Sequence, residues 1–254
     1  MKYHYIPQML VESQHKVTID IVGLGGTGSH VLTNIAMMSY AMKNVGKQPL
    51  FVRTFDPDTI HEHNIGRQAF SSSDVGKNKA VVLTERINRH YGTDWSAFPM
   101  KYHERDNRAS TSNIVITCVD SLKARKDTIS SILPPGNGNN WNIPYGTPCY
   151  WLDIGNSART GQIFLGTFHK VSKPDKESVQ YLPMILDEYK DIKDDPNEPS
   201  CSMIEALQSQ DLFVNKIMAT YAINMLWELF NRYRISYRGI FINLETLKTS
   251  PVML

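Results

Sequence analysis

The sequence predicts an α/β fold in which a mixed sheet lies between layers of helices. Three apolar segments of strand length, 17–22, 50–55 and 113–119, are separated by segments with helical patterning or by polar loops. Each strand ends in a glycine turn or a carboxylate, as at the ligand-binding edge of a parallel sheet. The chain has 254 residues, of which 41% are hydrophobic, so it is long enough for one sheet-centred core.

The first strand runs through a glycine turn into a helix, which we predict over 27–42. Glycines let the backbone approach a phosphate closely, and the helix that follows presents unpaired N–H groups and the positive end of its dipole to an anion. This Rossmann-like unit predicts a phosphate cradle formed by Gly23, Gly25, Gly26 and Gly28. A glycine turn without a ligand is the alternative, and the motif alone fits dinucleotide dehydrogenases as well as ATP users.

The second strand ends at Asp56, which follows Gly28 by 28 residues. An acid at this place holds ribose hydroxyls, although its usual distance from the glycines is about 20 residues. Arg67 and Lys79 follow in the next two loops. These cations favour ATP over a nicotinamide cofactor, because nucleotidyl transfer needs positive charge near phosphate oxygens that become more negative in the transition state.

The third strand ends at Asp120, ahead of a helix predicted over 121–133. Magnesium prefers one or two carboxylates together with phosphate oxygens and water, so a single aspartate at the end of a strand is chemically adequate. The same carboxylate is also a candidate N-cap of the helix. Both roles stay open at the level of sequence.

The second half of the chain predicts antiparallel strands that complete the sheet. A turn-rich loop, 133–140, separates a nucleotide half (about 17–133) from a partner-binding half (about 149–254) within one domain, 1–254. We expect strands at 149–154, 161–168 and 239–244, a core or interface helix over 211–232, and a crossover loop over about 170–200 that covers the partner's tail.

The motifs, taken in order over about residues 17–230, resemble the ThiF, MoeB and HesA family of adenylating enzymes, which activate ubiquitin-like proteins. The motifs are Gly23-Leu24-Gly25-Gly26-Thr27-Gly28, Asp56-Pro57-Asp58, Asn64-Ile65-Gly66-Arg67-Gln68, Gly76-Lys77-Asn78-Lys79, Cys118-Val119-Asp120-Ser121, Asp153-Ile154-Gly155 and Pro199-Ser200-Cys201-Ser202. The stretch 199–215 most resembles the ThiF-type protein of the bacterial PRTRC gene cluster.

The resemblance implies ATP-dependent adenylation of the C-terminal carboxylate of a ubiquitin-like or sulfur-carrier protein that ends in a free glycine. It implies that Asp56 binds the ribose and Asp120 a magnesium ion. Asn64, Arg67 and Lys79 would bind the phosphates, with Arg67 and Lys79 as catalytic cations. A conjugating protein is a further partner that this family implies.

The three cysteines differ in their surroundings. Cys118 and Cys149 lie in apolar segments and are expected to be small core residues. Cys201 follows a polar segment and precedes the long helix. A thiol near a helix N-terminus can have a lowered pKa, whereas the acidic residues of 187–198 oppose this effect. The resemblance implies a thioester on Cys201, and an ordinary cysteine near a helix end is the alternative.

Two features depart from the family pattern. Many relatives hold a structural zinc with two Cys-x-x-Cys pairs, and no two cysteines here are close enough to pair in that way, so no structural zinc is expected. Several relatives reach into the partner subunit's ATP site with an N-terminal arginine, and residues 1–16 contain none. A homodimer is still expected, without that contribution.

Composition narrows the remaining classes. The net charge of +2, with basic and acidic residues interleaved, gives no case for nucleic acid. No apolar run reaches the ~20 residues of a membrane span, and no signal peptide is visible, so a cytoplasmic protein is expected. Three alternatives stay open. The first is an enzyme that adenylates a small molecule, a peptide or a tRNA base. The other two are a catalytically silent nucleotide-binding scaffold and an NAD-dependent oxidoreductase.

Overall fold

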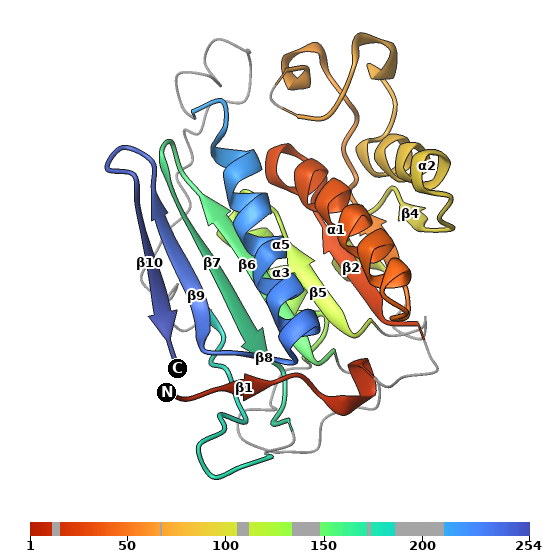
Figure 1. Cartoon of the computed structure of the whole chain (residues 1–254). Coiled ribbons are helices and arrows are strands. Elements are labelled where there is room, and N and C mark those ends of the chain that lie inside the picture. The colour runs from red at the N-terminus through yellow and green to blue at the C-terminus, as the bar shows by residue number, and fades with distance from the viewer. Residues whose placement is uncertain (12–15, 67, 106–111, 134–147, 172–173, 186–210) are drawn as a thin grey trace.

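The computed structural model describes residues 1–11, 16–66, 68–105, 112–133, 148–171, 174–185 and 211–254. Its centre is an eight-stranded mixed sheet with the order β10-β9-β7-β6-β5-β2-β3-β4 within these residues. β2, β3, β4, β5 and β6 run parallel, and β7, β9 and β10 continue the sheet in antiparallel fashion. The predicted Rossmann-like mixed sheet with an antiparallel C-terminal half is confirmed (Figure 1).

The predicted strands are present, and the structure adds others. The sheet consists of β2 (Thr18–Val22), β3 (Phe51–Phe55), β4 (Ser96–Phe98), β5 (Ile114–Thr117), β6 (Tyr150–Asn156), β7 (Thr160–Thr167), β9 (Tyr237–Asn243) and β10 (Lys248–Met253). β1 (His4–Tyr5) and β8 (Arg234–Ile235) form a separate two-stranded sheet. β4 and β10 were not predicted, because short segments with mixed polarity resemble loops in sequence.

Helices cover both faces of the sheet. α1 (Gly26–Asn44) and α5 (Val214–Arg232) lie side by side on one face, next to α2 (Lys79–Tyr91), and α3 (Leu122–Ser130) lies behind the sheet (Figure 1). Short 3-10 turns occur at η1 (Gln8–Leu10), η2 (Glu62–Asn64), η3 (Ser72–Asp74) and η4 (Tyr102–Glu104). The sequence analysis did not predict α2, whose N-cap is Asn78.

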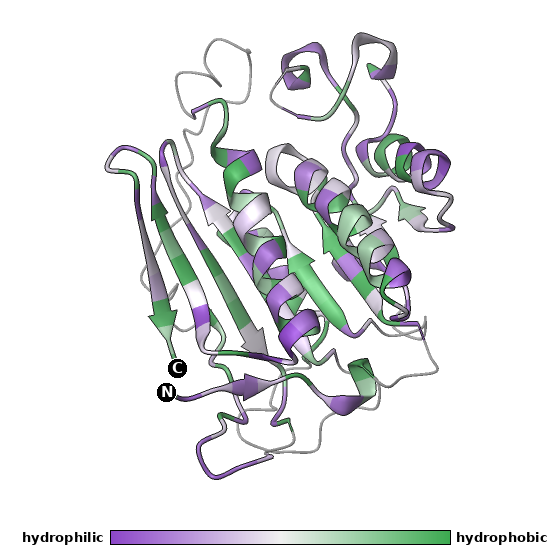
Figure 2. Ribbon diagram, in the orientation of Figure 1, coloured by the Kyte–Doolittle hydropathy of each residue, from purple (hydrophilic) through white to green (hydrophobic). Residues whose placement is uncertain are grey.

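Alternation along the strands explains this layering. In β6, Tyr150 and Leu152 belong to the main core under α1 and α5, whereas Trp151 packs in a second cluster with Leu122 of α3 and Phe164. The central strands are buried on both faces and are largely apolar, as is typical of parallel strands, with Asp20 on β2 and Arg53 on β3 as charged exceptions (Figure 2). Burial on both faces therefore fixes the carboxyl edge of the parallel strands as a rigid platform.

The N-terminus lies along the edge of the sheet opposite the glycine turn. His4 is fully buried there, where its Nδ1 donates to the Val179 carbonyl at 2.7 Å and its Nε2 accepts from the Tyr150 hydroxyl at 2.9 Å. Val179 also donates its N–H to the Tyr3 carbonyl. The described residues of the predicted crossover loop are 170–171 and 174–185, and Val179 places this part of the loop at the opposite edge. Residues 172–173 and 186–200 lie outside the described part of the chain.

Candidate nucleotide site

Three neighbouring parallel strands end at one edge of the sheet and bring the predicted nucleotide residues together. Val22 of β2 is in register with Phe55 of β3 and with Thr117 of β5. The Gly23 N–H donates to the Phe55 carbonyl at 2.9 Å, and the Cys118 N–H donates to the Val22 carbonyl at 2.8 Å. The glycine turn, Asp56 and Asp120 therefore begin from adjacent strand ends, as the sequence predicts.

The glycine turn is tightly packed at one end and open at another. Gly23 has φ +88°, and a Cβ at Gly28 would lie 1.8 Å from the Gly23 carbonyl oxygen. The turn therefore closes backbone against backbone, which a side chain at Gly28 would prevent. At Gly25, by contrast, Gln68 Nε2 at 4.0 Å is the nearest atom to a built Cβ among the described residues, apart from the chain neighbours of Gly25. As far as the described residues show, the space beside the N-cap of α1 could take a phosphate that approaches the first N–H groups of the helix.

Asp56 is buried, with 4% of its surface exposed, and is bound to the glycine turn. Its Oδ2 accepts from the Leu24 N–H at 2.5 Å and its Oδ1 from the Asp58 N–H at 2.8 Å. Burial raises the pKa of Asp56 above its usual value, against the lowering effect of these two donors and of Lys79. Each carboxylate oxygen has a second lone pair, so Asp56 can still accept a ribose hydroxyl.

Lys79 is held at the carboxyl edge of the sheet by hydrogen bonds between its neighbour Asn78 and the loop that follows β3. The Asn78 side chain donates to the carbonyls of Asp56 and Asp58 at 2.8 and 3.0 Å and caps α2 by accepting from the Val81 N–H. Lys79 is the first residue of α2 and is 8% exposed, and its Nζ donates to Asp58 Oδ2 at 3.0 Å. Because that carboxylate is 63% exposed, the ammonium group lies at the boundary between the core and the solvent.

Asn64 and Gln68 belong to a turn beside the glycine loop. Asn64 is buried and accepts the His61 N–H with its Oδ1 at 2.9 Å, so the structure shows a local structural role for its side chain. The Gln68 N–H donates to the Asn64 carbonyl at 3.1 Å, and the Ala69 N–H donates to the Ser29 hydroxyl of α1 at 3.4 Å. Arg67, predicted to bind the phosphates, lies outside the described residues.

Asp120 is exposed at the end of β5, and it is not the helix cap. Ser121 caps α3 instead, by accepting the Ala124 N–H at 3.2 Å. Arg125 holds this turn in place, since its Nη1 donates to the Asp120 carbonyl at 3.4 Å and its Nε donates to the buried Asp153 at 3.0 Å. An exposed carboxylate beside a phosphate cradle fits the oxygen chemistry of magnesium.

A polar cluster joins the start of α1 to the C-terminal half. The Thr27 hydroxyl contacts Asn156 Oδ1 at 3.1 Å and Asn215 Oδ1 at 2.9 Å, and the Asn156 side chain donates to Asn215 at 3.1 Å. A Cβ at Gly26 would lie 2.6 Å from the Asn215 side-chain nitrogen. α5 therefore contacts the glycine turn from far along the chain, since Thr27 and Asn215 are 188 positions apart.

Of the three cysteines, Cys118 and Cys149 lie in the described part of the chain. Cys149 is buried, and burial raises the pKa of its thiol to about 11. Cys118 is half-buried directly after β5, not within the strand, and burial also raises the pKa of its thiol. Both are thiols at neutral pH, consistent with the predicted packing role. Cys201 lies outside the described residues.

No group of three or more histidine, cysteine, aspartate and glutamate side chains able to hold a metal ion occurs among the described residues. The rings of His61 and His63 stack on each other with centroids 5.4 Å apart. Within the same residues, no helix is long and apolar enough to span a membrane.

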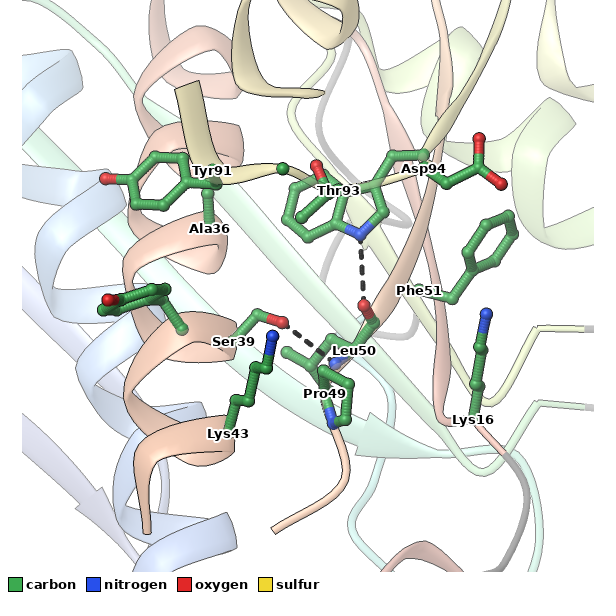
Figure 3. Close-up of a pocket in the computed structure, with 13 residues that line it drawn as sticks. Lys16, Ala36, Ser39, Lys43, Pro49, Leu50, Phe51, Tyr91, Thr93 and Asp94 are labelled. Atoms are coloured by element: carbon green, nitrogen blue, oxygen red, sulfur yellow. Dashed lines mark hydrogen bonds between the residues drawn. The ribbon is translucent and has the colours of Figure 1, made fainter. Parts of the chain in front are cut away.

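A cavity of about 240 Å³ lies at the amino edge of the sheet, away from the glycine turn (Figure 3). Its lining includes Lys16, Lys43 and Tyr91. Two polar groups of its wall are already bonded, because the Leu50 N–H donates to the Ser39 hydroxyl at 3.0 Å and the Leu50 carbonyl accepts from the indole of Trp95 at 3.1 Å. This cavity is separate from the predicted nucleotide site.

The sequence analysis assigned no role to three side chains that position the candidate site. Asp58 pairs with Lys79, Asn78 ties two loops together, and Arg125 fixes the turn that carries Asp120. Asn78 could have been found, because an asparagine directly before a helical pattern is a typical N-cap. The partners of Asp58 and Arg125 depend on tertiary contacts that no local pattern reveals.

The chain belongs to the ThiF family, whose model matches residues 4–250. Among its relatives is the NEDD8-activating enzyme E1 catalytic subunit of Dictyostelium discoideum, which is 30% identical over 123 residues. That match covers 47% of this chain and 26% of the relative, so the chain spans about a quarter of the relative it matches.

Solved structures share the fold. Escherichia coli MccB with MccA aligns with a TM-score of 0.59 and 16% identity over 94% of this chain and 64% of that one. MccB with ATP aligns with a TM-score of 0.54 and 17% identity over 93% and 63% of the two chains. At these identities the likeness concerns the fold alone.

Proposed function

We propose that this protein binds ATP at the carboxyl edge of the sheet and adenylates the C-terminal carboxylate of a ubiquitin-like or sulfur-carrier protein. The observation that carries the proposal is the buried Asp56 carboxylate, which is hydrogen-bonded to the glycine turn and lies in a loop tied to Lys79. Membership of the ThiF family supports the same chemistry, as does the fold shared with MccB, which has been solved with ATP.

In this proposal the partner's carboxylate attacks the α-phosphate of ATP. The P–O bond to the β-phosphate breaks, pyrophosphate leaves, and an acyl adenylate forms. Asp56 holds the ribose, and the N–H groups at the start of α1 hold phosphate oxygens. Arg67 and Lys79 stabilise the negative charge that develops on the phosphate oxygens, and Asn64 orients the phosphates from the same turn.

Asp120 is the residue we propose for magnesium, which would neutralise charge on the pyrophosphate when bound. The carboxylate is exposed and follows the strand next to the glycine turn. Arg125 fixes its backbone, so the carboxylate begins from a defined position. We expect no structural zinc.

A second step would transfer the acyl group from the adenylate to the Cys201 thiolate, which forms a thioester and releases AMP. A conjugating protein or a sulfur donor would then accept the acyl group. Adenylation of a small molecule, a peptide or a tRNA base shares every ATP residue and does not need this cysteine.

Finer assignments belong to the same proposal. The protein acts as a cytoplasmic homodimer of the bacterial PRTRC subtype, and its C-terminal half, about 149–254, receives the partner's tail. The nucleotide half, about 17–133, supplies the ATP site. A nucleotide-binding scaffold and an NAD-dependent oxidoreductase are the competing classes: the first experiment tests the oxidoreductase, and pyrophosphate exchange into ATP tests the scaffold.

That experiment measures thermal unfolding with ATP and Mg²⁺ or with NAD, for the wild type and Asp120→Ala. At 100 times its Kd, ATP should add about 2.7 kcal/mol to the free energy of unfolding. Asp120→Ala should weaken this stabilisation. Asp127→Ala is the matched control, because Asp127 pairs with Lys123 on the next helix and should leave it unchanged. A response to NAD alone would overturn ATP binding, and a response to neither would contradict ATP binding by this protein in the absence of its partner.

The thioester step has its own test. With the partner present, Cys201→Ala should abolish a protein adduct that is cleaved by thiol reductants, while pyrophosphate exchange into ATP stays at the wild-type rate. Exchange depends only on adenylation, so its loss in this variant would contradict the two-step scheme. Cys149→Ser serves as a control for a thiol in the core.

A further inference from the structure

The cavity at the amino edge of the sheet has one wall built on a single face of α1. Ala36, Ser39 and Lys43 line it from positions three and four residues apart, which places them on the same side of the helix. Ser39 is buried, with 3% of its surface exposed, whereas Lys43 is exposed near the end of the helix. Figure 3 shows these two side chains next to each other, so a buried hydroxyl and an ammonium group stand together at this wall.

The Ser39 hydroxyl keeps a hydrogen for a ligand. Its oxygen accepts the Leu50 N–H at 3.0 Å, and in the part of the chain that the structure describes no group accepts its hydrogen. A serine hydroxyl can accept and donate at the same time. Ser39 can therefore donate to an acceptor in the cavity without giving up its bond to Leu50.

A second wall, residues 91–95, carries two aromatic rings and is fixed before any ligand binds. Asn88 Oδ1 accepts the Thr93 hydroxyl at 2.7 Å and the Trp95 N–H at 2.9 Å, and Asn88 Nδ2 donates to the Trp95 carbonyl at 2.9 Å. The Trp95 indole donates to the Leu50 carbonyl at 3.1 Å. Mostly apolar walls with a few placed polar groups are typical of small-molecule sites, and a preformed wall loses little freedom on binding.

The lining has an excess of positive charge. Of the described residues that form it, Lys16 and Lys43 are the cations and Asp94 is the acid. The Lys16 ammonium lies 5.7 Å from the centroid of the Phe51 ring, on the side of the cavity away from Lys43 (Figure 3). Asp94 is exposed, so water and salt screen its charge. This combination favours an anion with an apolar body.

We propose that this cavity binds a small monocarboxylate with an aromatic or aliphatic body. The carboxylate accepts from the Ser39 hydroxyl and pairs with the Lys43 ammonium, and the body lies against Leu50 and Trp95. The volume of about 240 Å³ is below the range of about 300–1,000 Å³ for pockets of drug-sized ligands, so the ligand is a small metabolite. The site does not depend on the proposed ATP site, because Gly26 and Lys43 are about 25 Å apart along α1.

The first test titrates the full chain with 3-phenylpropionate, with its neutral amide 3-phenylpropanamide and with acetate. 3-Phenylpropionate should bind with a Kd on the order of 1 mM or below and shift the NMR signal of the Trp95 indole N–H. The amide, which has no charge for Lys43, should bind about fivefold more weakly, and acetate, which has no apolar body, about tenfold more weakly or less tightly still. The indole of Trp151, which donates to the Thr117 hydroxyl and packs on the other face of the sheet, should not shift.

The second test changes the charges of the lining. Lys43→Met should raise the Kd of 3-phenylpropionate about three- to fivefold and leave the Kd of the amide unchanged. Lys123→Met, on α3 at the other face of the sheet, is the matched control and should bind the acid as the wild type does. Asp94→Asn should bind the acid at least as tightly as the wild type, and saturating ATP with Mg²⁺ should not displace it.

Five results would each overturn the proposal. They are an unmoved Trp95 signal, an amide that binds as tightly as the acid, a wild-type Kd for the acid in Lys43→Met, weaker binding in Asp94→Asn, and displacement of the acid by ATP. Failure of the wild type to bind ATP, with the acid still bound, would contradict the proposed function alone.

Discussion

The buried carboxylate of Asp20, inside the sheet, accepts hydrogen bonds on both oxygens, whereas the carboxylate of Asp58, at the carboxyl edge, is largely open to solvent. Asp20 on β2 is fully buried and accepts from Arg53 Nε at 2.7 Å, from Arg53 Nη2 at 2.9 Å and from the Tyr102 hydroxyl at 2.9 Å. Asp58 has one described ion pair, with Lys79, and its carboxylate is 63% exposed. The same residue type is thus used in two ways, within β2 and in the loop that follows the neighbouring β3.

The difference follows from what burial demands. A carboxylate in the interior must be paired and hydrogen-bonded, or its desolvation cost would exceed the gain from folding. At the carboxyl edge water is available, so the exposed carboxylates of Asp58 and Asp120 need no full set of protein partners, which fits the ATP site that we propose there. The fully hydrogen-bonded pair of Asp20 and Arg53 is therefore interpreted as structural, and the exposed pair of Asp58 and Lys79 as part of the proposed site.

The largest expected effect comes from breaking the saturated pair. Asp20→Ala leaves the buried Arg53 guanidinium without its carboxylate and the Tyr102 hydroxyl without its acceptor. Loss of one partner of a buried pair costs about 3–5 kcal/mol, so the free energy of unfolding in urea should fall by about that much.

Asp58→Ala is the matched comparison at the edge. Because the carboxylate is exposed, its removal should change the free energy of unfolding by less than about 1 kcal/mol. A loss similar to that of Asp20→Ala would contradict the distinction between the two regions.

An effect smaller than that of Asp20→Ala should appear with pH at His4, whose two ring nitrogens are both hydrogen-bonded. Burial lowers the pKa of His4 from 6.5 to about 4, against the raising effect of its hydrogen bond to the Val179 carbonyl. The unfolded chain therefore takes up a proton as the pH falls below about 6.5, while the folded protein takes it up only near pH 4. The stability that neutral His4 provides is present above pH 6.5 and is lost between pH 6.5 and 4, a total on the order of 3 kcal/mol.

His4→Gln isolates this contribution, because glutamine can make both hydrogen bonds and does not titrate. The difference in free energy of unfolding between wild type and variant, measured at pH 7, 5.5 and 4, should shift towards the variant as the pH falls. A difference that is constant over this range would mean that His4 keeps an ordinary pKa in the folded protein.

Most of the parallel half of the sheet could be predicted from the sequence. The strands near residues 18–22, 51–55 and 114–117 are short, mainly apolar runs followed by glycine or aspartate, a pattern that predicts buried strands. β10 could not be predicted, since Lys248–Met253 contains proline and polar residues and is a strand only because β9 offers it an edge. α2 was missed because its N-cap lies inside a motif that we interpreted only as a phosphate-binding loop.

The site was predicted in part. The residues that follow strand ends, Asp56 and Asp120, could be placed because parallel strands bring their carboxyl ends to one edge. The alternative role of Asp120 as a helix cap was decided by the structure, in which Ser121 caps α3. Asn64 faces its own turn by accepting the His61 N–H, so its predicted phosphate contact stays a prediction.

By itself the sequence determined the order of strands and turns and the chemistry at their ends, because apolar periodicity and glycine placement are local properties. Only the tertiary structure decided which charges are saturated and which are open. The pairing of Asp20 with Arg53, of Lys79 with Asp58 and of Thr27 with Asn215 joins residues that are 21 to 188 positions apart. Such contacts depend on how the elements pack, and no single segment of sequence contains that information.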